Sequence, residues 1–365
     1  MAPLRILVVD DSVVIRKILS ETLSSDPDIE VVATAGDGRI GLAKIAQLHP
    51  DLITLDVEMP VMDGLQALAE VRKLYASLPV IMFSTLTERG ASATLDALSL
   101  GASDYVTKPS NTGSMSVAVE RIKAELIPKI KELCARPAAR PAMRPPLRPA
   151  PRMRPAVPRP IEIVAIGTST GGPNALAEVV PGFAKDFPVP IVAVQHMPPL
   201  FTKMLADRLA SRSRIPVEEG AADVPLAPGH AWIAPGNFHM SVKRAGLSAR
   251  LSLNQDPPEN SCRPAVDVLF RSVASMYGAS ALAIVMTGMG ADGVIGSQKI
   301  REAGGHVIIQ DEASSVVWGM PGLVYAAGLA DGVFPLNQLA AEITRRVTES
   351  RALGSARRAA DHVTL

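Results

Sequence analysis

The chain has 365 residues, enough for two or three domains that each bury a core. Its composition, 47% hydrophobic and 20% charged, is typical of a globular protein in water, and no apolar run is long enough to cross a membrane. Acidic residues follow soon after the N-terminus, which argues against a signal peptide, and the two cysteines lack metal-ligand spacing. We therefore expect a cytoplasmic protein with free thiols and no insertion into a membrane.

The formal net charge of +1 is unevenly distributed along the chain. Residues 135–160 contain seven arginines and nine prolines but no aspartate, glutamate or lysine. The rest of the chain is therefore mildly acidic in sum. Because an acidic protein surface repels phosphates, we expect no nucleic-acid partner.

Short apolar runs alternate with helix-like stretches between residue 1 and about residue 115. The runs cover residues 4–9, 30–34, 52–55, 80–83 and 104–107. Alternation of this kind predicts a parallel sheet covered by helices on both faces. Any functional site should then lie at the carboxyl ends of the strands.

Polar residues stand at these predicted strand ends. Asp10 and Asp11 follow the first run and Asp56 follows the third, while the fourth and fifth end at Ser84 and Lys108. Neighbouring carboxylates repel one another unless a cation such as Mg²⁺ joins them. A lysine and a hydroxyl would then stabilise a phosphoryl group transferred to one carboxylate. The alternative is a set of solvated acids at the edge of a sheet.

These positions, together with residues 9–12, 56–60, 63–64 and 108–109, resemble the receiver domain of response regulators. The resemblance covers nearly all of residues 1–125 and implies a flavodoxin-like fold with a doubly wound, five-stranded parallel sheet. It implies that a histidine kinase phosphorylates one aspartate and that Mg²⁺ assists. The implied residues are Asp56 as phosphoacceptor, Asp10, Asp11, Asp56 and the Glu58 carbonyl as metal ligands, Ser84 and Lys108 as phosphoryl sensors, and Tyr105 as a packing switch nearby.

A helical extension and a linker are predicted between the two halves of the chain, at residues 126–160. Apolar residues recur on one face over residues 117–134, although Pro128 should kink or interrupt that helix. The proline-rich residues 136–160 favour extended polyproline II, a tether of up to roughly 80 Å at about 3.1 Å per residue. Its arginines are either a solvated spacer, which we favour, or a docking surface for an acidic partner.

The second half opens with a short apolar run at residues 161–166, which predicts a buried strand. A glycine-walled turn at residues 167–172 follows, and then a predicted helix at residues 174–180. In this G-x-S-x-G context the glycines permit a sharp turn that lifts the Ser169 hydroxyl clear of the sheet. Ser169 is therefore a candidate nucleophile; the alternative is a glycine-rich turn that binds phosphate.

Two further apolar runs, at residues 190–195 and 281–286, predict buried strands that end next to His196 and Asp292. If these strands are parallel to the first, Ser169, His196 and Asp292 meet at one edge of the sheet, as hydroxyl, base and orienting carboxylate. The backbone N–H groups of Thr170 and Met289 are candidate oxyanion donors. Two alternatives stay open: His239 is a rival base, and Asp292 could simply cap the following helix.

The order Ser, His, Asp differs from the Ser, Asp, His order of α/β-hydrolases. The second half instead resembles the catalytic domain of bacterial chemotaxis protein-glutamate methylesterases (CheB-type enzymes). The matching segments are residues 167–172, 195–198, 263–264, 267–270, 286–293 and 310–322. Thr168 and Ala265 stand where alanine and serine are more usual. The resemblance implies a doubly wound, mainly parallel α/β esterase domain at residues 161–348, followed by a tail at residues 349–365.

The resemblance also implies the activity. The enzyme would hydrolyse glutamyl γ-methyl esters on methyl-accepting chemoreceptors, releasing methanol, and would deamidate particular glutamines there. It would be a monomer controlled by a chemotaxis histidine kinase, with Mg²⁺ in the receiver domain and no cofactor in the catalytic domain. We expect the unphosphorylated receiver to cover the esterase site. The alternatives are a receiver-controlled nucleotide-binding module and a transcriptional regulator. The chain lacks an acidic residue placed for ribose and a helix-turn-helix pattern.

Overall fold

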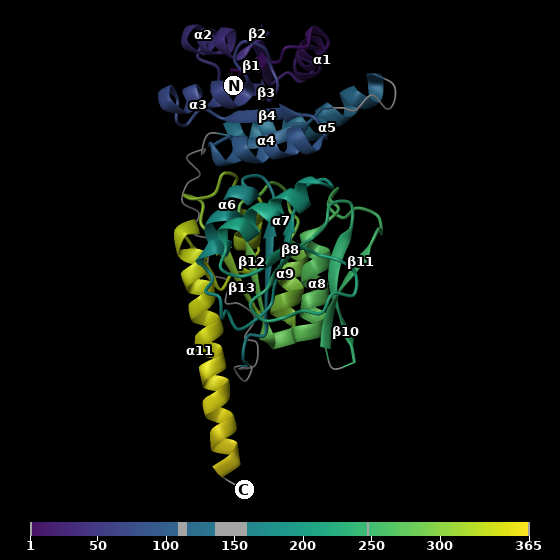
Figure 1. Ribbon diagram of the computed structural model, residues 1–365, viewed down its shortest axis with the longest axis vertical. Helices are drawn as coiled ribbons and strands as arrows, with labels where there is room; N and C mark the ends of the chain where they lie inside the picture. The colour runs from purple at the N-terminus through teal and green to yellow at the C-terminus, as the bar shows by residue number, and fades with distance from the viewer. Residues whose placement is uncertain (1, 109–114, 136–158, 247, 364–365) are drawn as a thin grey trace. The chain divides into compact units, whose positions relative to one another are not determined.

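The computed structural model describes residues 2–108, 115–135, 159–246 and 248–363. The chain forms two compact units, Met1–Arg140 and Pro141–Leu365 (Figure 1). Most of the predicted proline-rich tether, residues 136–158, lies outside the described residues. No helix in the described part of the chain is both long enough and apolar enough to span a membrane.

The first unit is built on a five-stranded, wholly parallel sheet with the strand order β2-β1-β3-β4-β5. Strands β3, β4 and β5 are buried along their whole length because helices cover both faces of a parallel sheet, whereas the edge strand β2 is mostly half-buried. The strand order reverses between β1 and β3, which is where such sheets bind ligands. The strands are β1 Leu4–Val9, β2 Ile29–Ala35, β3 Leu52–Asp56, β4 Val80–Ser84 and β5 Asp104–Thr107.

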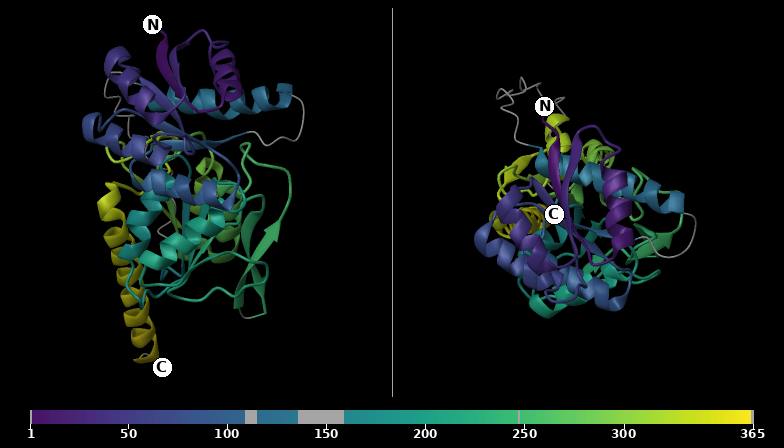
Figure 2. Two further views of the ribbon diagram at one scale, coloured as in Figure 1. Left: turned by 45° about the horizontal axis from the view of Figure 1, so that its top comes forward. Right: turned by 90° about the horizontal axis from the view of Figure 1, so that it is seen from above.

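Five helices in the described part of this unit cover the sheet. Helices α1 and α5 pack against each other on one face, and α3 contacts both α2 and α4 (Figure 2). In four of these helices a side-chain cap accepts the backbone N–H of the third helical residue; these caps are Ser12, Asp37, Asp63 and Thr87. The helices are α1 Val13–Leu23, α2 Gly38–Leu48, α3 Gly64–Leu74, α4 Glu88–Ser99 and α5 Met115–Cys134.

Helix α5 continues past residue 125, where the receiver domain was expected to end. It runs as one element through Pro128, so the proline does not interrupt it. Leu126 and Ile130 are fully buried in the core of the first unit. Burial of these side chains stabilises the helix across the hydrogen bond that proline cannot donate. The packed part of this unit therefore extends to Cys134.

The second unit contains a seven-stranded sheet with the order β14-β13-β12-β6-β7-β9-β8, in which every pairing is parallel. The chain leaves β6 toward β7 and later returns to β12 on the other side of β6, so β6 and β12 flank the point where strand order reverses. The strands are β6 Ile163–Thr168, β7 Ile191–Gln195, β8 Val217–Glu219, β9 Ala231–Ile233, β12 Ala281–Val285, β13 His306–Gln310 and β14 Gly332–Phe334.

A separate antiparallel hairpin joins β10 His239–Ala245 to β11 Ser248–Asn254. Helix α8 packs on β6, β7, β10 and β12 and against α9, and α6 contacts α7 and α11. The helices are α6 Gly172–Val179, α7 Phe201–Arg212, α8 Val266–Tyr277, α9 Val294–Glu302, α10 Met320–Ala326 and α11 Leu336–Val363, with single 3₁₀ turns at η1 Val180–Gly182 and η2 Gly278–Ser280. Helix α11 includes most of the expected C-terminal tail. The predicted fold class of two doubly wound α/β units is confirmed.

Candidate functional site

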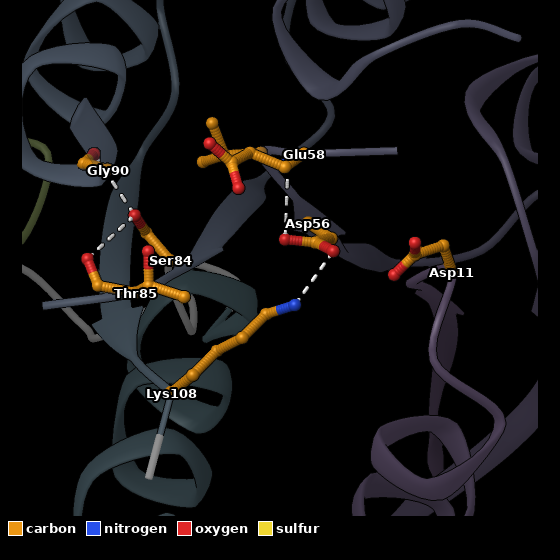
Figure 3. A pocket seen from close by; sticks show the side chains of 8 residues that line it. Asp11, Asp56, Glu58, Ser84, Thr85, Gly90 and Lys108 are labelled. Atoms are coloured by element: carbon orange, nitrogen blue, oxygen red, sulfur yellow. Dashed lines mark hydrogen bonds and ion pairs between the residues drawn. The ribbon is translucent and has the colours of Figure 1, made fainter. Parts of the chain in front are cut away.

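Three carboxylates meet at the strand-order reversal of the first unit. Asp10 follows β1, Asp56 ends β3, and one oxygen from each of Asp10, Asp11 and Asp56 lies within 4.8 Å of the others. Lys108 Nζ forms ion pairs with Asp10 Oδ2 at 2.9 Å and with Asp56 Oδ2 at 2.7 Å. Figure 3 shows the lysine reaching from the end of β5 toward Asp56. The parallel sheet thus brings together the acids and the cation that the sequence placed at strand ends.

The electrostatics of this cluster fit a divalent cation. Burial raises the pKa of Asp56 to about 6, and the charge of Asp10 adds to the rise while Lys108 opposes it. Burial also raises the pKa of Asp10. A cation among these oxygens would stabilise the ionised carboxylates, and hard oxygen ligands suit Mg²⁺. The residues present therefore fit the expected Mg²⁺ site.

Two other expected receiver residues, Glu58 and Ser84, line the same pocket, a cavity of about 200 Å³ (Figure 3). Ser84 lines it, and its hydroxyl donates a hydrogen bond to Gly90 O at 3.1 Å. The Glu58 N–H donates to Asp56 Oδ1 at 3.4 Å, and the Glu58 carboxylate pairs with Arg89 at 3.2 Å. The Glu58 side chain is therefore engaged away from the acids, which leaves its main chain beside them.

Tyr105 lies on β5 and is not among the residues that line the pocket. Its ring is buried, and burial raises the pKa of its hydroxyl well above the usual value. Lys129 of α5 sits 5.4 Å from the ring centroid, donates to Tyr105 O at 2.8 Å and pairs with Asp104 at 2.8 Å. Tyr105 is thus packed against α5, and its role as a switch stays a prediction.

In the second unit, Ser169 lies in the turn between β6 and α6. Gly171, at the N-terminus of α6, has φ +77°, a left-handed conformation that favours glycine. The loop after β12 packs directly on this turn: a Cβ at Gly288 would lie 2.8 Å from Ser169 Cβ. Thr287 Oγ1 donates to Thr170 O at 2.9 Å and ties the two loops together. Thr170 and Met289, the expected oxyanion donors, therefore belong to two segments that meet at Ser169.

His196 and Asp292 form the closest contact among the three expected triad residues. His196 follows β7, Asp292 follows β12, and His196 Nε2 lies 2.7 Å from Asp292 Oδ2. Both strands pair with β6, so the turns after all three strands lie at the same edge of the sheet. Burial lowers the pKa of His196, but the Asp292 hydrogen bond outweighs burial and raises it to about 10.

Buried Gln195 joins the serine turn to the histidine turn. Its amide Nε2 donates to Ser169 O at 2.9 Å and to His196 O at 3.2 Å. Its Oε1 accepts a hydrogen bond from Thr168 Oγ1 at 2.7 Å. The side chain is 2% exposed, so these bonds replace water that it cannot reach. Gln195 therefore sets the relative positions of the two turns.

Asp292 does not cap the helix that follows it in the way the alternative proposed. Val266 and Asp267 are the first two residues of α8. The Val266 N–H donates to Asp292 Oδ2 at 2.6 Å, and the Asp267 N–H donates to Asp292 Oδ1 at 2.9 Å. Among the backbone N–H groups that Asp292 accepts, only that of Gly293, at 3.0 Å, belongs to the start of α9, the helix that follows Asp292. Burial raises the pKa of Asp292, but His196 and these backbone donors outweigh burial and hold it below the usual range.

The rival base His239 lies at the start of β10. The hydrogen-bond partner of its Nε2 is the carbonyl oxygen of Pro257, at 3.1 Å. A carbonyl can hold an imidazole but does not stabilise its charged form as a carboxylate does. Among the described residues, no carboxylate is hydrogen-bonded to His239, so it lacks the orienting acid that His196 has.

Comparisons with known proteins identify the family of each unit. Residues 6–120 match the response regulator receiver domain family, and residues 164–343 match the CheB methylesterase family. A protein-glutamate methylesterase/protein-glutamine glutaminase of Trichodesmium erythraeum is 54% identical over 351 residues, covering 95% of this chain and 100% of that protein. The chain belongs to the CheB methylesterase family.

Other family members support the same assignment. A protein-glutamate methylesterase/protein-glutamine glutaminase of a Nocardioides species is 51% identical over 358 residues, covering 96% of this chain and 97% of that protein. The chain is also similar to the crystal structure of the Thermotoga maritima CheB methylesterase catalytic domain, with 42% sequence identity and a TM-score of 0.50. The aligned region covers 50% of this chain and 97% of the Thermotoga chain. Family membership thus extends over both units.

Several residues of this CheB-family site received no functional role from the sequence. Asp267 and Gln195 stand within segments that carried the resemblance, which was the only signal for them. Asn260 and Cys262 lie in an irregular loop, where no periodic pattern marks a residue as functional. Asn260 Nδ2 bridges Asp267 Oδ2 and Asp292 Oδ1, each at 3.0 Å, and Cys262 Sγ lies 3.5 Å from His196 Nδ1.

Proposed function

We propose that Ser169, His196 and Asp292 are the nucleophile, the general base and the orienting carboxylate of this enzyme. As a CheB-family chain with a receiver domain, the protein is a protein-glutamate methylesterase and protein-glutamine glutaminase of chemotaxis, regulated by phosphorylation. The observation that supports the residue assignment is the 2.7 Å contact between His196 and Asp292, at strand ends that adjoin the serine turn.

The chemistry follows from the two ring nitrogens of His196. Asp292 accepts the Nε2–H, which leaves Nδ1 to take the proton of the Ser169 hydroxyl. Ser169 Oγ then attacks the side-chain carbonyl carbon of the substrate, and the N–H groups of Thr170 and Met289 stabilise the oxyanion. His196 gives the proton to the leaving methanol, or to ammonia when the substrate is glutamine. Water, activated by the same base, hydrolyses the acyl-enzyme.

In the receiver unit, Asp56 accepts the phosphoryl group from a chemotaxis histidine kinase. Mg²⁺ held by Asp10, Asp11 and Asp56, with the Glu58 carbonyl, would neutralise the negative charge that accumulates during transfer. Lys108, already paired with Asp56, remains as the cation that contacts the phosphoryl oxygens. The Ser84 hydroxyl can exchange its bond to Gly90 O for one to the phosphoryl group. That exchange would connect phosphorylation to the start of α4.

The substrates in this proposal are methyl-accepting chemoreceptors, and the enzyme works as a cytoplasmic monomer. The two cysteines are free in the structure, which suits a reducing compartment. The unphosphorylated receiver would restrain the esterase, and phosphorylation of Asp56 would shift the population toward an active state. Deleting residues 1–160 should then raise basal methanol release, whereas an unchanged or lower rate from the folded fragment would refute the restraint.

Methanol release from methylated receptor, with and without a small phosphodonor, tests the assignment. Ser169→Ala should abolish release while leaving Asp56 phosphorylation intact. Asp56→Asn should keep the basal rate and lose the stimulation by phosphodonor. Appreciable turnover by Ser169→Ala would place the nucleophile elsewhere.

A further inference from the structure

The nitrogen that His196 needs for catalysis is in contact with a thiol. Asp292 occupies Nε2, so Nδ1 is the ring atom left for proton transfer. Cys262 Sγ lies 3.5 Å from that Nδ1, within the range of a hydrogen bond to sulfur. Within the described residues, the Ser169 hydroxyl makes no hydrogen bond to His196. The group that meets the free nitrogen before substrate arrives is therefore the thiol of Cys262.

A tight turn holds Cys262 in this position. Glu259 and Cys262 exchange two backbone hydrogen bonds, Cys262 N to Glu259 O at 2.8 Å and Glu259 N to Cys262 O at 3.1 Å. The two residues between them, Asn260 and Ser261, have φ of +50° and +61°. Asparagine tolerates this left-handed conformation better than most residues. The turn is thus defined by its own backbone and does not depend on the imidazole.

The same turn is anchored to the carboxylate on the other side of the ring. The amide of Asn260 donates to Asp292 Oδ1 at 3.0 Å, and Asp292 Oδ2 contacts His196 Nε2. Glu259, at the start of the turn, pairs with Arg271 of α8. One rigid assembly therefore presents a carboxylate to one ring nitrogen and a thiol to the other.

We propose that Cys262 is a positioning residue for His196. Its S–H donates to Nδ1, keeps the Nε2–H directed at Asp292, and holds the ring in place until the Ser169 hydroxyl replaces the thiol at Nδ1. This inference rests on the proposed role of His196 as the base and extends it. The thiol forms no covalent bond to substrate in this scheme.

The charges around this contact define how it affects titration. Asp292 faces the ring directly, and Asp267 lies behind Asp292 with the Glu259–Arg271 pair beside them. An S–H donor at Nδ1 stabilises the unprotonated ring. Removing the sulfur should therefore move the acidic limb of the activity profile to higher pH, which loss of packing alone would not do.

The experiment measures kcat, KM and the pH dependence of kcat/KM for methanol release by the full-length protein. Cys262→Ala should lower kcat by roughly 10-fold to 100-fold, because the ring loses a positioning contact, and should leave KM within about twofold. Its acidic limb should shift to higher pH. Cys262→Ser, which restores a donor of similar size, should recover most of kcat. Cys134→Ala, which removes the other cysteine from the receiver unit, is the matched control and should behave as the wild type.

Two results would separate the possible failures. If Ser169→Ala is inactive but Cys262→Ala keeps the wild-type kcat and pH profile, the positioning role is wrong and the triad stands. If Ser169→Ala keeps its activity, the proposed triad itself is wrong. If Cys262→Ala loses activity and Cys262→Ser does not restore it, the donor role is also wrong.

Discussion

Asp267 and Asp292 cap each other's helices. Asp292, which directly precedes the N-cap of α9, accepts the first two N–H groups of α8 at 2.6 and 2.9 Å. Asp267, in the first turn of α8, accepts the N–H groups of Gly293 and Gly296 at the start of α9 at 3.0 and 2.6 Å. Each carboxylate is thus stabilised by the positive end of a helix dipole. The exchange locks the proposed catalytic carboxylate to two helices at once.

Replacing Asp267 tests this exchange. Asp267→Ala removes the side-chain acceptor of the buried Gly296 N–H and leaves Asp292 as the side-chain acceptor of the Gly293 N–H. It should reduce the free energy of unfolding of the second unit by about 2 kcal/mol. For a unit of this size the midpoint of thermal unfolding should fall by roughly 4 to 8 °C in scanning calorimetry. Asp267→Asn, which keeps an acceptor oxygen, is the control and should cost less. An unchanged midpoint in Asp267→Ala would show that the caps do not stabilise the unit.

The orienting role of Asp292 makes a separate prediction. Asp292→Asn places an amide where a carboxylate faces His196 Nε2, so the ring loses both its preferred tautomer and the charge that stabilises its protonated form. We expect kcat to fall on the order of 10³-fold to 10⁴-fold while the protein stays folded. Methanol release and calorimetry measure the two effects. A loss of less than tenfold would mean that His196 does not depend on this carboxylate.

Raising the pH should have opposite effects on activity and stability. The base must be unprotonated, so kcat/KM should increase as pH rises toward the His196 pKa of about 10. The pKa in the folded state lies above the unfolded value, so the folded state holds a proton that the unfolded chain releases near pH 6.5. The stability of the second unit should therefore fall between about pH 6.5 and 10. Calorimetry at several pH values measures the stability. The Ser169→Ala protein gives the background rate of base-catalysed ester hydrolysis, which is subtracted from the activity at each pH.

Gln195 should affect the reaction without contacting it. Gln195→Leu removes the two hydrogen bonds that tie the serine turn to the histidine turn and leaves Ser169 O and His196 O without that donor. We expect kcat to fall roughly 10-fold to 100-fold because the two turns lose their relative position, with KM nearly unchanged. Steady-state methanol release measures both constants. A change in KM alone would assign Gln195 to substrate binding instead.

Removing the metal should affect the function of the receiver unit but not that of the esterase unit. Among the described residues, the carboxylates that could hold a cation together are Asp10, Asp11 and Asp56 in the receiver unit. A chelator should therefore abolish stimulation by a small phosphodonor and leave the basal rate of methanol release unchanged. Asp11→Asn, which removes one candidate ligand, should require more Mg²⁺ for half-maximal stimulation. Loss of the basal rate on chelation would indicate a metal in the esterase unit.

Much of this architecture was predictable from local pattern. Buried parallel strands are short apolar runs, and their carboxyl ends share one edge of the sheet. The positions of Asp10, Asp56, His196 and Asp292 follow from these two facts alone. The sequence therefore determined the first sheet, the three central strands of the second sheet, and which acids and bases would stand at their carboxyl ends.

Only the tertiary structure decided which atoms of those residues meet. That Asp292 caps α8, that Asn260 bridges two carboxylates, and that Cys262 reaches His196 Nδ1 all depend on rotamers and on left-handed backbone in an irregular loop. Hydrophobic periodicity reports on burial along one segment and contains no information about such contacts. Asn260 and Asp292 are 32 residues apart in the sequence, and Cys262 and His196 are 66 residues apart. These contacts form only because the packing of the helices onto the sheet brings those loops together.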